Sequence, residues 1–233
     1  MKTIPTSPAR RAFTLTELLA VVAVIGVLAG ILIPVVSHVR LSAARAVTTS
    51  NLRTLHQAIL LYASDHKTRL PGPCGVGILF QAHIPSQPAD TAHLGAFVAP
   101  YLATAPSDSN QWVTLPALKC PALSDEAQSN PLVANFVKLD DAVTSDDNIF
   151  GTSVATMSAA AAAATDPSKK MPKLMGEVTV PASRKAIVCT ADQLSWVGVY
   201  NVSLPPGPVF DGRRLYLFLD GRVALSANGR SGR

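Results

Sequence analysis

Charged and small residues near the N-terminus could take part in one chemical step. Arg10 and Arg11 precede an Ala12–Phe13 peptide bond, and Glu17 lies four residues after Phe13. A carboxylate deep in a membrane costs about 2.5–3.5 kcal/mol, so the start of a long apolar run is an unfavourable place for Glu17. Cleavage between Ala12 and Phe13 would create an α-amino group one helical turn from Glu17. Such an ammonium would offset much of that cost, because opposite charges attract strongly where the dielectric constant is low.

The apolar run that follows Glu17 contains no charged residue over the 19 positions 18–36. At 1.5 Å per residue these positions make a helix of roughly 28 Å, close to the roughly 30 Å thickness of a bilayer core. The run must be helical in lipid, since the backbone there can form hydrogen bonds only with itself. We therefore expect a transmembrane helix over about residues 15–36.

The order of residues around Phe13 resembles the type IV prepilin family, which includes the pseudopilins of type II secretion. That family has a short basic leader, a cleavage site before a phenylalanine, and a glutamate at the fifth mature position. Phe13 and Glu17 hold these two positions here, with Thr14 and Leu15 directly after the phenylalanine. Ala12 stands where the family usually has glycine. The likeness covers roughly residues 8–65.

Two further residues agree with the family pattern, since Gly26 and Pro34 fall where pilins commonly carry glycine and proline. The resemblance implies a pilin or pseudopilin of a type IV pilus or a type II secretion pseudopilus. A prepilin peptidase would cleave between Ala12 and Phe13 and methylate the new amine. Assembly with other subunits, by an inner-membrane machinery, would use the helix and Glu17.

Other functions are compatible with the same N-terminus. A plain secretory signal peptide could be cleaved among the small residues 42–46, although its apolar region is normally only 7–15 residues long. A plain signal anchor without an assembly role is a second alternative. Neither accounts for Glu17 or for the FTLTE order. A monomeric periplasmic binding protein that uses a pilin leader as its anchor is the main alternative to a filament subunit, and a tethered enzyme is a more distant one.

The helix is expected to continue beyond the membrane as an amphipathic segment. Apolar or small side chains recur at helical spacing, which defines one buried face: Leu41, Ala44, Thr48, Leu52, Leu55, Ile59 and Tyr62. Pro34 removes one helical hydrogen bond and should bend the helix. The helix should end near Lys67, before the Pro71–Pro73 segment. The predicted divisions are a leader at 1–12, the helix at 13–66 and a globular domain at 67–233.

The prepilin resemblance implies an α+β, pilin-like fold, in which the helix packs on an antiparallel sheet with long loops. Residues 71–131 are rich in proline and predict loops with short elements, such as 94–102. Strands are expected at 185–190 and 197–202. A hairpin is expected at 215–225, with a two-residue turn at Asp220–Gly221. The stretches LGAFVAPYL, LKCP and LFLDGRV resemble the H-X9-DG subgroup of pilin-like proteins, although Phe210 stands where that motif has histidine.

An acidic cluster in the stretch KLDDAVTSDDN is a weak candidate for calcium, a cation that prefers oxygen ligands. Its members are Asp140, Asp141, Asp146 and Asp147. A solvated loop is the simpler interpretation, and the spacing excludes an EF-hand. We expect no other metal and no cofactor.

Three cysteines leave two arrangements open. Cys74 and Cys120 both lie beside prolines in loop-like sequence and could form a disulfide. Three reduced, buried cysteines, with Cys189 as the third, are the alternative. No Cys-x-x-Cys pair or zinc-like spacing of histidine and cysteine occurs.

The charge distribution bears on partners and location. The formal net charge of +5 includes Lys2, Arg10 and Arg11 of the leader, and no lysine or arginine stripe indicates nucleic-acid binding. Three cations before the span favour a cytoplasmic N-terminus, with the C-terminal domain outside the cytoplasm. The prepilin resemblance implies that the membrane is the bacterial inner membrane and that the domain is periplasmic or extracellular. Arg40 and Arg45 after the span reduce this asymmetry.

No catalytic motif is present in the sequence. The five histidines are scattered, and we expect His38, His56 and His66 to lie on the surface of the helix. Asp192 and Asp220 with Ser195 lack the motif context of a hydrolase. We therefore expect the protein not to be an enzyme.

Overall fold

A computed structural model describes residues 15–75, 77–79, 81–83, 93–102, 112–130, 133–139, 149–151, 171–194 and 204–227. The chain divides into two compact units, Met1–Ser42 and Ala43–Arg233. The boundary falls inside the long helix, because the second half of that helix contributes its side chains to the core of the globular unit. The expected strand at 197–202 lies outside the described residues.

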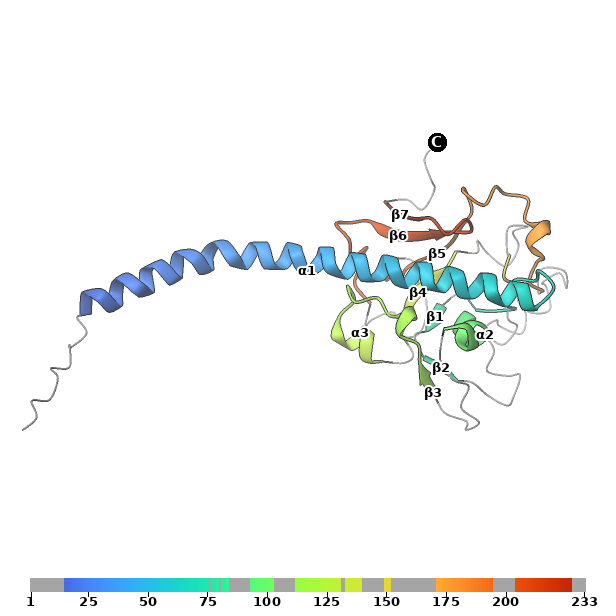
Figure 1. Ribbon diagram of the computed structural model, residues 1–233, viewed down its shortest axis with the longest axis horizontal. Helices are drawn as coiled ribbons and strands as arrows, with labels where there is room; N and C mark the ends of the chain where they lie inside the picture. The colour runs from blue at the N-terminus through green and yellow to red at the C-terminus, as the bar shows by residue number, and fades with distance from the viewer. Residues whose placement is uncertain are drawn as a thin grey trace, which may run out of the picture. The chain divides into compact units, whose positions relative to one another are not determined.

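A single helix of 51 residues, α1 (Leu15–Asp65), begins the described chain (Figure 1). It is continuous through position 34 and ends one residue before the boundary expected at 66. After Asp65 the backbone enters the left-handed region, since Lys67 and Thr68 have φ angles of 55° and 63°. The amide of Thr68 donates to the carbonyl oxygen of Ala63 at 2.8 Å, which satisfies one of the last carbonyls of the helix.

The second half of α1 buries the face that the sequence predicts. Thr48, Leu52, Leu55 and Ile59 are fully buried, and Ala44 and Tyr62 are half-buried. Charged and polar residues at 45, 53, 57 and 65 are exposed. This part of α1 is therefore a core element of the globular unit, and the apolar area it removes from water stabilises that unit.

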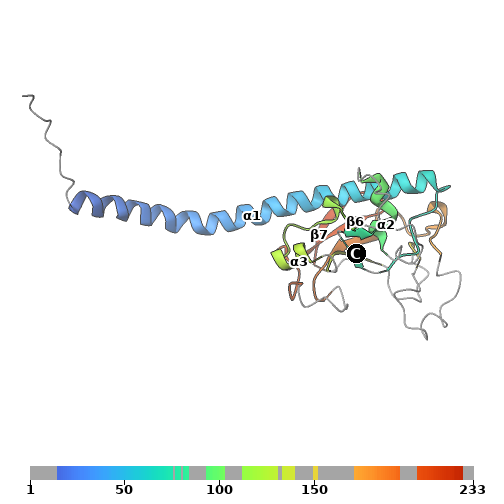
Figure 2. The same cartoon turned by 90° about the horizontal axis from the view of Figure 1, so that it is seen from below.

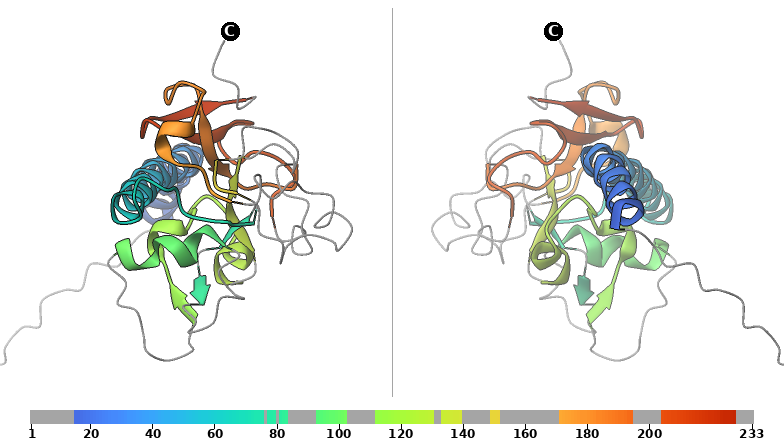
Figure 3. Two further views of the ribbon diagram at one scale, coloured as in Figure 1. Left: turned by 90° about the vertical axis from the view of Figure 1, so that its right-hand side faces the viewer. Right: turned by 90° about the vertical axis from the view of Figure 1, so that its left-hand side faces the viewer.

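The globular unit is built on a five-stranded antiparallel sheet in the order β1-β4-β5-β6-β7. Its strands are β1 (Gly77–Leu79), β4 (Ala134–Lys138), β5 (Ala186–Thr190), β6 (Arg214–Phe218) and β7 (Val223–Ser226). All residues of β4 are buried, so both faces of the sheet centre are covered. Figures 2 and 3 show the second half of α1 beside these strands. The α+β, pilin-like architecture expected from the sequence is confirmed.

Short elements occupy the proline-rich region after β1, as expected. A two-stranded ribbon joins β2 (Gln81–His83) to β3 (Trp112–Thr114). The helices in this region are α2 (Leu94–Val98), the 3-10 turns Ala99–Tyr101 and Pro116–Leu118, and α3 (Asp125–Ser129). Ser124 caps α3 by accepting a hydrogen bond from the amide of Ala127.

The turn between β6 and β7 differs from the two-residue turn expected at Asp220–Gly221. The amide of Phe218 donates to the carbonyl oxygen of Arg222, so three residues, 219–221, form the loop. Gly221 has a φ of 83°, which is the left-handed position that such three-residue loops require.

A two-residue Asp-Gly turn does occur nearby, at Asp211–Gly212. Their φ angles are 52° and 71°, and Phe210 pairs with Arg213 across the turn. Two successive positive φ angles are those of a type I′ turn, which an Asp-Gly pair favours. The chain therefore contains two Asp-Gly pairs, and only the first forms the turn that the pattern predicts.

Of the two cysteine arrangements that the sequence leaves open, the structure has the three buried thiols, without a Cys74–Cys120 disulfide. The sulfur of Cys120 lies 3.7 Å from the hydroxyl of Thr48 on α1. The amide of Cys120 donates to the side chain of Asn135 on β4 at 2.9 Å. These contacts place Cys120 between α1 and the sheet. The carbonyl oxygen of Cys74 instead accepts from the buried amine of Lys138.

Candidate processing and membrane site

The residues on either side of the expected cleavage point, Ala12 and Phe13, lie outside the described residues. The helix is already formed at Leu15, and Glu17 lies in its first turn with an exposed side chain. A carboxylate in this position interacts favourably with the positive end of the helix dipole. Glu17 is the only acidic residue of α1 before Asp65.

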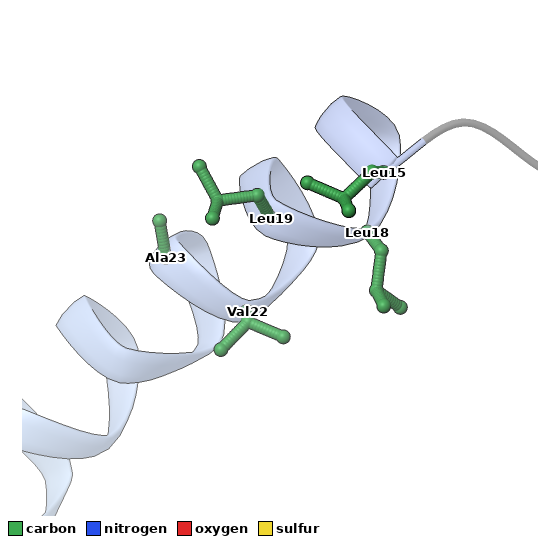
Figure 4. A pocket seen from close by; sticks show the side chains of 5 residues that line it. All are labelled: Leu15, Leu18, Leu19, Val22 and Ala23. Atoms are coloured by element: carbon green, nitrogen blue, oxygen red, sulfur yellow. The ribbon is translucent and has the colours of Figure 1, made fainter.

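Apolar side chains surround this turn of the helix. Leu15, Leu18, Leu19, Val22 and Ala23 project from successive turns and line a hollow on the helix surface (Figure 4). Leu15, Leu18 and Leu19 are 79%, 58% and 67% exposed. Such exposure of large apolar side chains in water is unfavourable, so we expect lipid or other apolar helices to cover this surface.

The same exposure continues along the first unit. Large apolar residues from Leu15 to Val39 are exposed throughout, and α1 is long and apolar enough to cross a membrane by length and composition. A Cβ atom at Gly26 or Gly30 would meet nothing within 4 Å apart from the helix's own backbone, so the helix surface is accessible there. The bend expected at Pro34 stays a prediction, although the helix is not interrupted at that position.

The other candidate residues from the sequence do not converge on a site. Asp140, Asp141, Asp146 and Asp147 lie outside the described residues, so the calcium prediction stays untested. Among the residues that the structure describes, no group of three or more His, Cys, Asp or Glu side chains could hold a metal ion. Cys74 and Cys120 are separate buried thiols.

His56 and Asp192 have structural partners that local sequence does not reveal. His56 is 9% exposed, so the expectation of a surface histidine is wrong for this residue, whereas His38 and His66 are exposed. Asp192 accepts two hydrogen bonds from the guanidinium of Arg214, one of them at 2.8 Å from Nη2 to Oδ1. This ion pair raises the pKa of Arg214. Arg214 lies 22 positions further along the chain, and only the pairing of β5 with β6 brings it close.

The N-terminal features can be compared with known proteins. A family model described as the prokaryotic N-terminal methylation motif matches residues 7–33. The chain carries a type IV prepilin-like leader. The match includes Ala12, Phe13 and Glu17, and it ends before Pro34. No curated protein and no solved structure matches the chain.

This leader and the apolar helix together indicate a membrane-anchored protein of the pilin or pseudopilin type, processed by a prepilin peptidase. Such proteins assemble with other pilin subunits. The leader match covers residues 7–33, and the long N-terminal helix with the C-terminal antiparallel sheet gives the chain an α+β, pilin-like architecture.

Proposed function

We propose that the protein is a structural subunit, a pilin or pseudopilin, of a type IV pilus or a type II secretion pseudopilus. The observation that carries the proposal is the continuity of two features. The methylation motif at 7–33 includes the start of a helix whose apolar side chains are exposed from Leu15 to Val39. A lipid bilayer covers that surface before assembly, and neighbouring helices cover it in a filament.

In this proposal the peptidase cleaves between Ala12 and Phe13 and the amine of Phe13 is methylated. Lys2, Arg10 and Arg11 hold the N-terminus in the cytoplasm before cleavage. The globular unit then lies on the periplasmic or extracellular side of the bacterial inner membrane. The protein is not an enzyme in this account, and it needs no cofactor.

Two glycine residues of α1 support assembly through close packing of helices. Gly26 and Gly30 are four residues apart on the same face, and nothing lies over either of them in the isolated chain. Glycine in a helix interior costs about 1 kcal/mol relative to alanine. In apolar surroundings, small residues at this spacing let two helix backbones approach closely, which offsets that cost.

Glu17 has a defined part in the proposed assembly. Within a filament its carboxylate would lie among apolar helices, where an ion loses most of its hydration. The ammonium of Phe13 from a neighbouring subunit is the proposed partner, and this charge pair sets the axial register between subunits.

Shearing of cells tests the proposal. Released filaments should contain the processed protein, and an assembly ATPase deletion should remove it from this fraction without lowering its level in the membrane. A protein that is processed but never enters the sheared fraction, under conditions in which other subunits do, would instead be the membrane-anchored binding protein.

A further inference from the structure

The segment just beyond the apolar run carries an unusual charge pattern. After the uncharged positions 18–36, the polar side chains of Ser37, His38 and Arg40 follow within one helical turn. All three side chains are exposed on α1. Arg40 lies four residues after Val36, or about 6 Å further along the helix axis. With residues 18–36 in the bilayer core, Arg40 is therefore at the level of the lipid headgroups.

The helix itself offers Arg40 no negative partner. Between Glu17 and Asp65 the sequence of α1 contains no aspartate or glutamate, so no carboxylate lies three or four positions from Arg40. The nearest of these two acids is 23 residues away, or roughly 35 Å along the axis. Counter-charge for the guanidinium must come from outside the helix.

We propose that Arg40 binds the phosphodiester group of a membrane phospholipid on the extracytoplasmic side. This inference rests on the proposed membrane anchoring of the chain. The guanidinium is planar and presents paired N–H donors that match two phosphate oxygens. A compact headgroup phosphate lies at the depth where the helix places Arg40, and anionic headgroups attract basic residues next to a span. The contact fixes how deep the helix lies in the mature protein, since cleavage removes the three leader cations at the opposite end.

Solid-state NMR of the processed chain, from Phe13 onward, in vesicles can detect this contact directly, because this chain lacks Arg10 and Arg11 of the leader. The protein would carry ¹³C at the arginine Cζ positions, in vesicles of phosphatidylglycerol and phosphatidylethanolamine, and dephasing of ¹³C by ³¹P would be recorded. A guanidinium that binds a phosphate lies roughly 4 Å from phosphorus, because charge-assisted N–H···O distances are about 2.8 Å. The parent protein should show a strongly dephased Cζ component.

Matched variants assign that component. Arg40→Gln should reduce it to background, whereas Arg53→Gln should leave it unchanged, because Arg53 is exposed 13 positions further along the helix. Arg40→Lys should retain insertion but lose the arginine signal. A component that survives in Arg40→Gln overturns the assignment, and so does a parent protein without dephasing, which would leave a carboxylate of a second copy as the counter-charge.

The outcome is independent of filament assembly, since the vesicles contain no assembly machinery. Inserted protein without the phosphorus contact overturns this inference alone and leaves the proposed function intact. Protein that does not insert into these vesicles overturns the membrane anchoring and this inference with it.

Discussion

His56 on α1 donates a hydrogen bond from Nε2 to the carbonyl oxygen of Leu219, at 2.9 Å. A carbonyl oxygen can only accept, so the proton is on Nε2. The contact ties the second half of the helix to the turn between β6 and β7. Gly221 in the same turn lies against the ring, since a Cβ there would be 2.8 Å from His56 Nδ1.

This contact makes Gly221→Ala a costly substitution. Alanine would have to adopt a φ of 83° and would also press on the imidazole. We expect a loss of about 2–3 kcal/mol in the free energy of unfolding, from backbone strain and overpacking together. Denaturant unfolding of the full chain in detergent measures it.

Two other glycines serve as controls for this prediction. Gly212 has a φ of 71° but open space around it, so Gly212→Ala should cost only the strain, about 1–2 kcal/mol. Gly207 has open space and no such φ, so Gly207→Ala should change stability by less than about 0.5 kcal/mol. Equal costs for Gly221→Ala and Gly212→Ala would show that the His56 ring is not held against the turn.

Burial of Cys189 predicts a loss of stability at alkaline pH. Burial raises the pKa of its thiol to about 12, whereas a thiol in an unfolded chain has a pKa of about 8.5. The unfolded state therefore loses its proton first. The free energy of unfolding should be independent of this group below about pH 8 and should fall as the pH rises toward 12.

Denaturant unfolding between pH 8 and pH 10.5, in the presence of a reductant, tests this expectation. Cys189→Ala should show a shallower decline over this range than the parent protein, since other titrating groups affect both equally. Identical slopes for the two proteins would contradict the raised pKa.

The division between Ser42 and Ala43 predicts which fragment folds. A chain that begins at Ala43 keeps the buried face of α1, including Leu52, Leu55 and Ile59, and should be soluble and monomeric. A chain that begins at residue 67 loses these side chains and exposes the sheet, so it should aggregate. Size-exclusion chromatography distinguishes the two outcomes. Aggregation of the longer fragment would mean that the helix buries a different face.

Glu17→Gln should separate assembly from processing. Folding, insertion and cleavage do not need the proposed charge pair and should stay near parental levels. Filament yield should fall several-fold, because the amine of Phe13 in a neighbouring subunit would lose its counter-charge in apolar surroundings. The ratio of sheared filament to total membrane protein measures this, with Thr16→Ala as the neighbouring control. Equal assembly of Glu17→Gln and the parent would refute the charge-pair account.

Local periodicity predicts those helices and strands that can be recognised from their own residues alone. The buried face from Thr48 to Ile59 follows from a spacing of three and four residues, and the strand at 186–190 follows from a short apolar run. The leader is readable for the same reason, because Arg10, Phe13 and Glu17 lie within eight residues.

Long-range contacts could not be predicted in the same way. His56 forms a hydrogen bond with the carbonyl oxygen of Leu219, which is 163 positions away in the sequence. Arg214 forms an ion pair with Asp192 because β5 and β6 lie side by side. Nothing in the sequence around either residue indicates its partner. The two Asp-Gly pairs also show that a turn signal depends on its context. Asp211–Gly212 forms the tight turn, while the contact with His56 accompanies a longer loop at Asp220–Gly221.

The mature N-terminus tests the central claim most directly. Mass spectrometry of the N-terminal peptide from the membrane fraction should find a chain that begins at Phe13 with a methylated amine, and this form should disappear when the prepilin peptidase is deleted. A chain that begins at Met1 in cells with an active peptidase, or at a residue beyond Val36, would contradict the account.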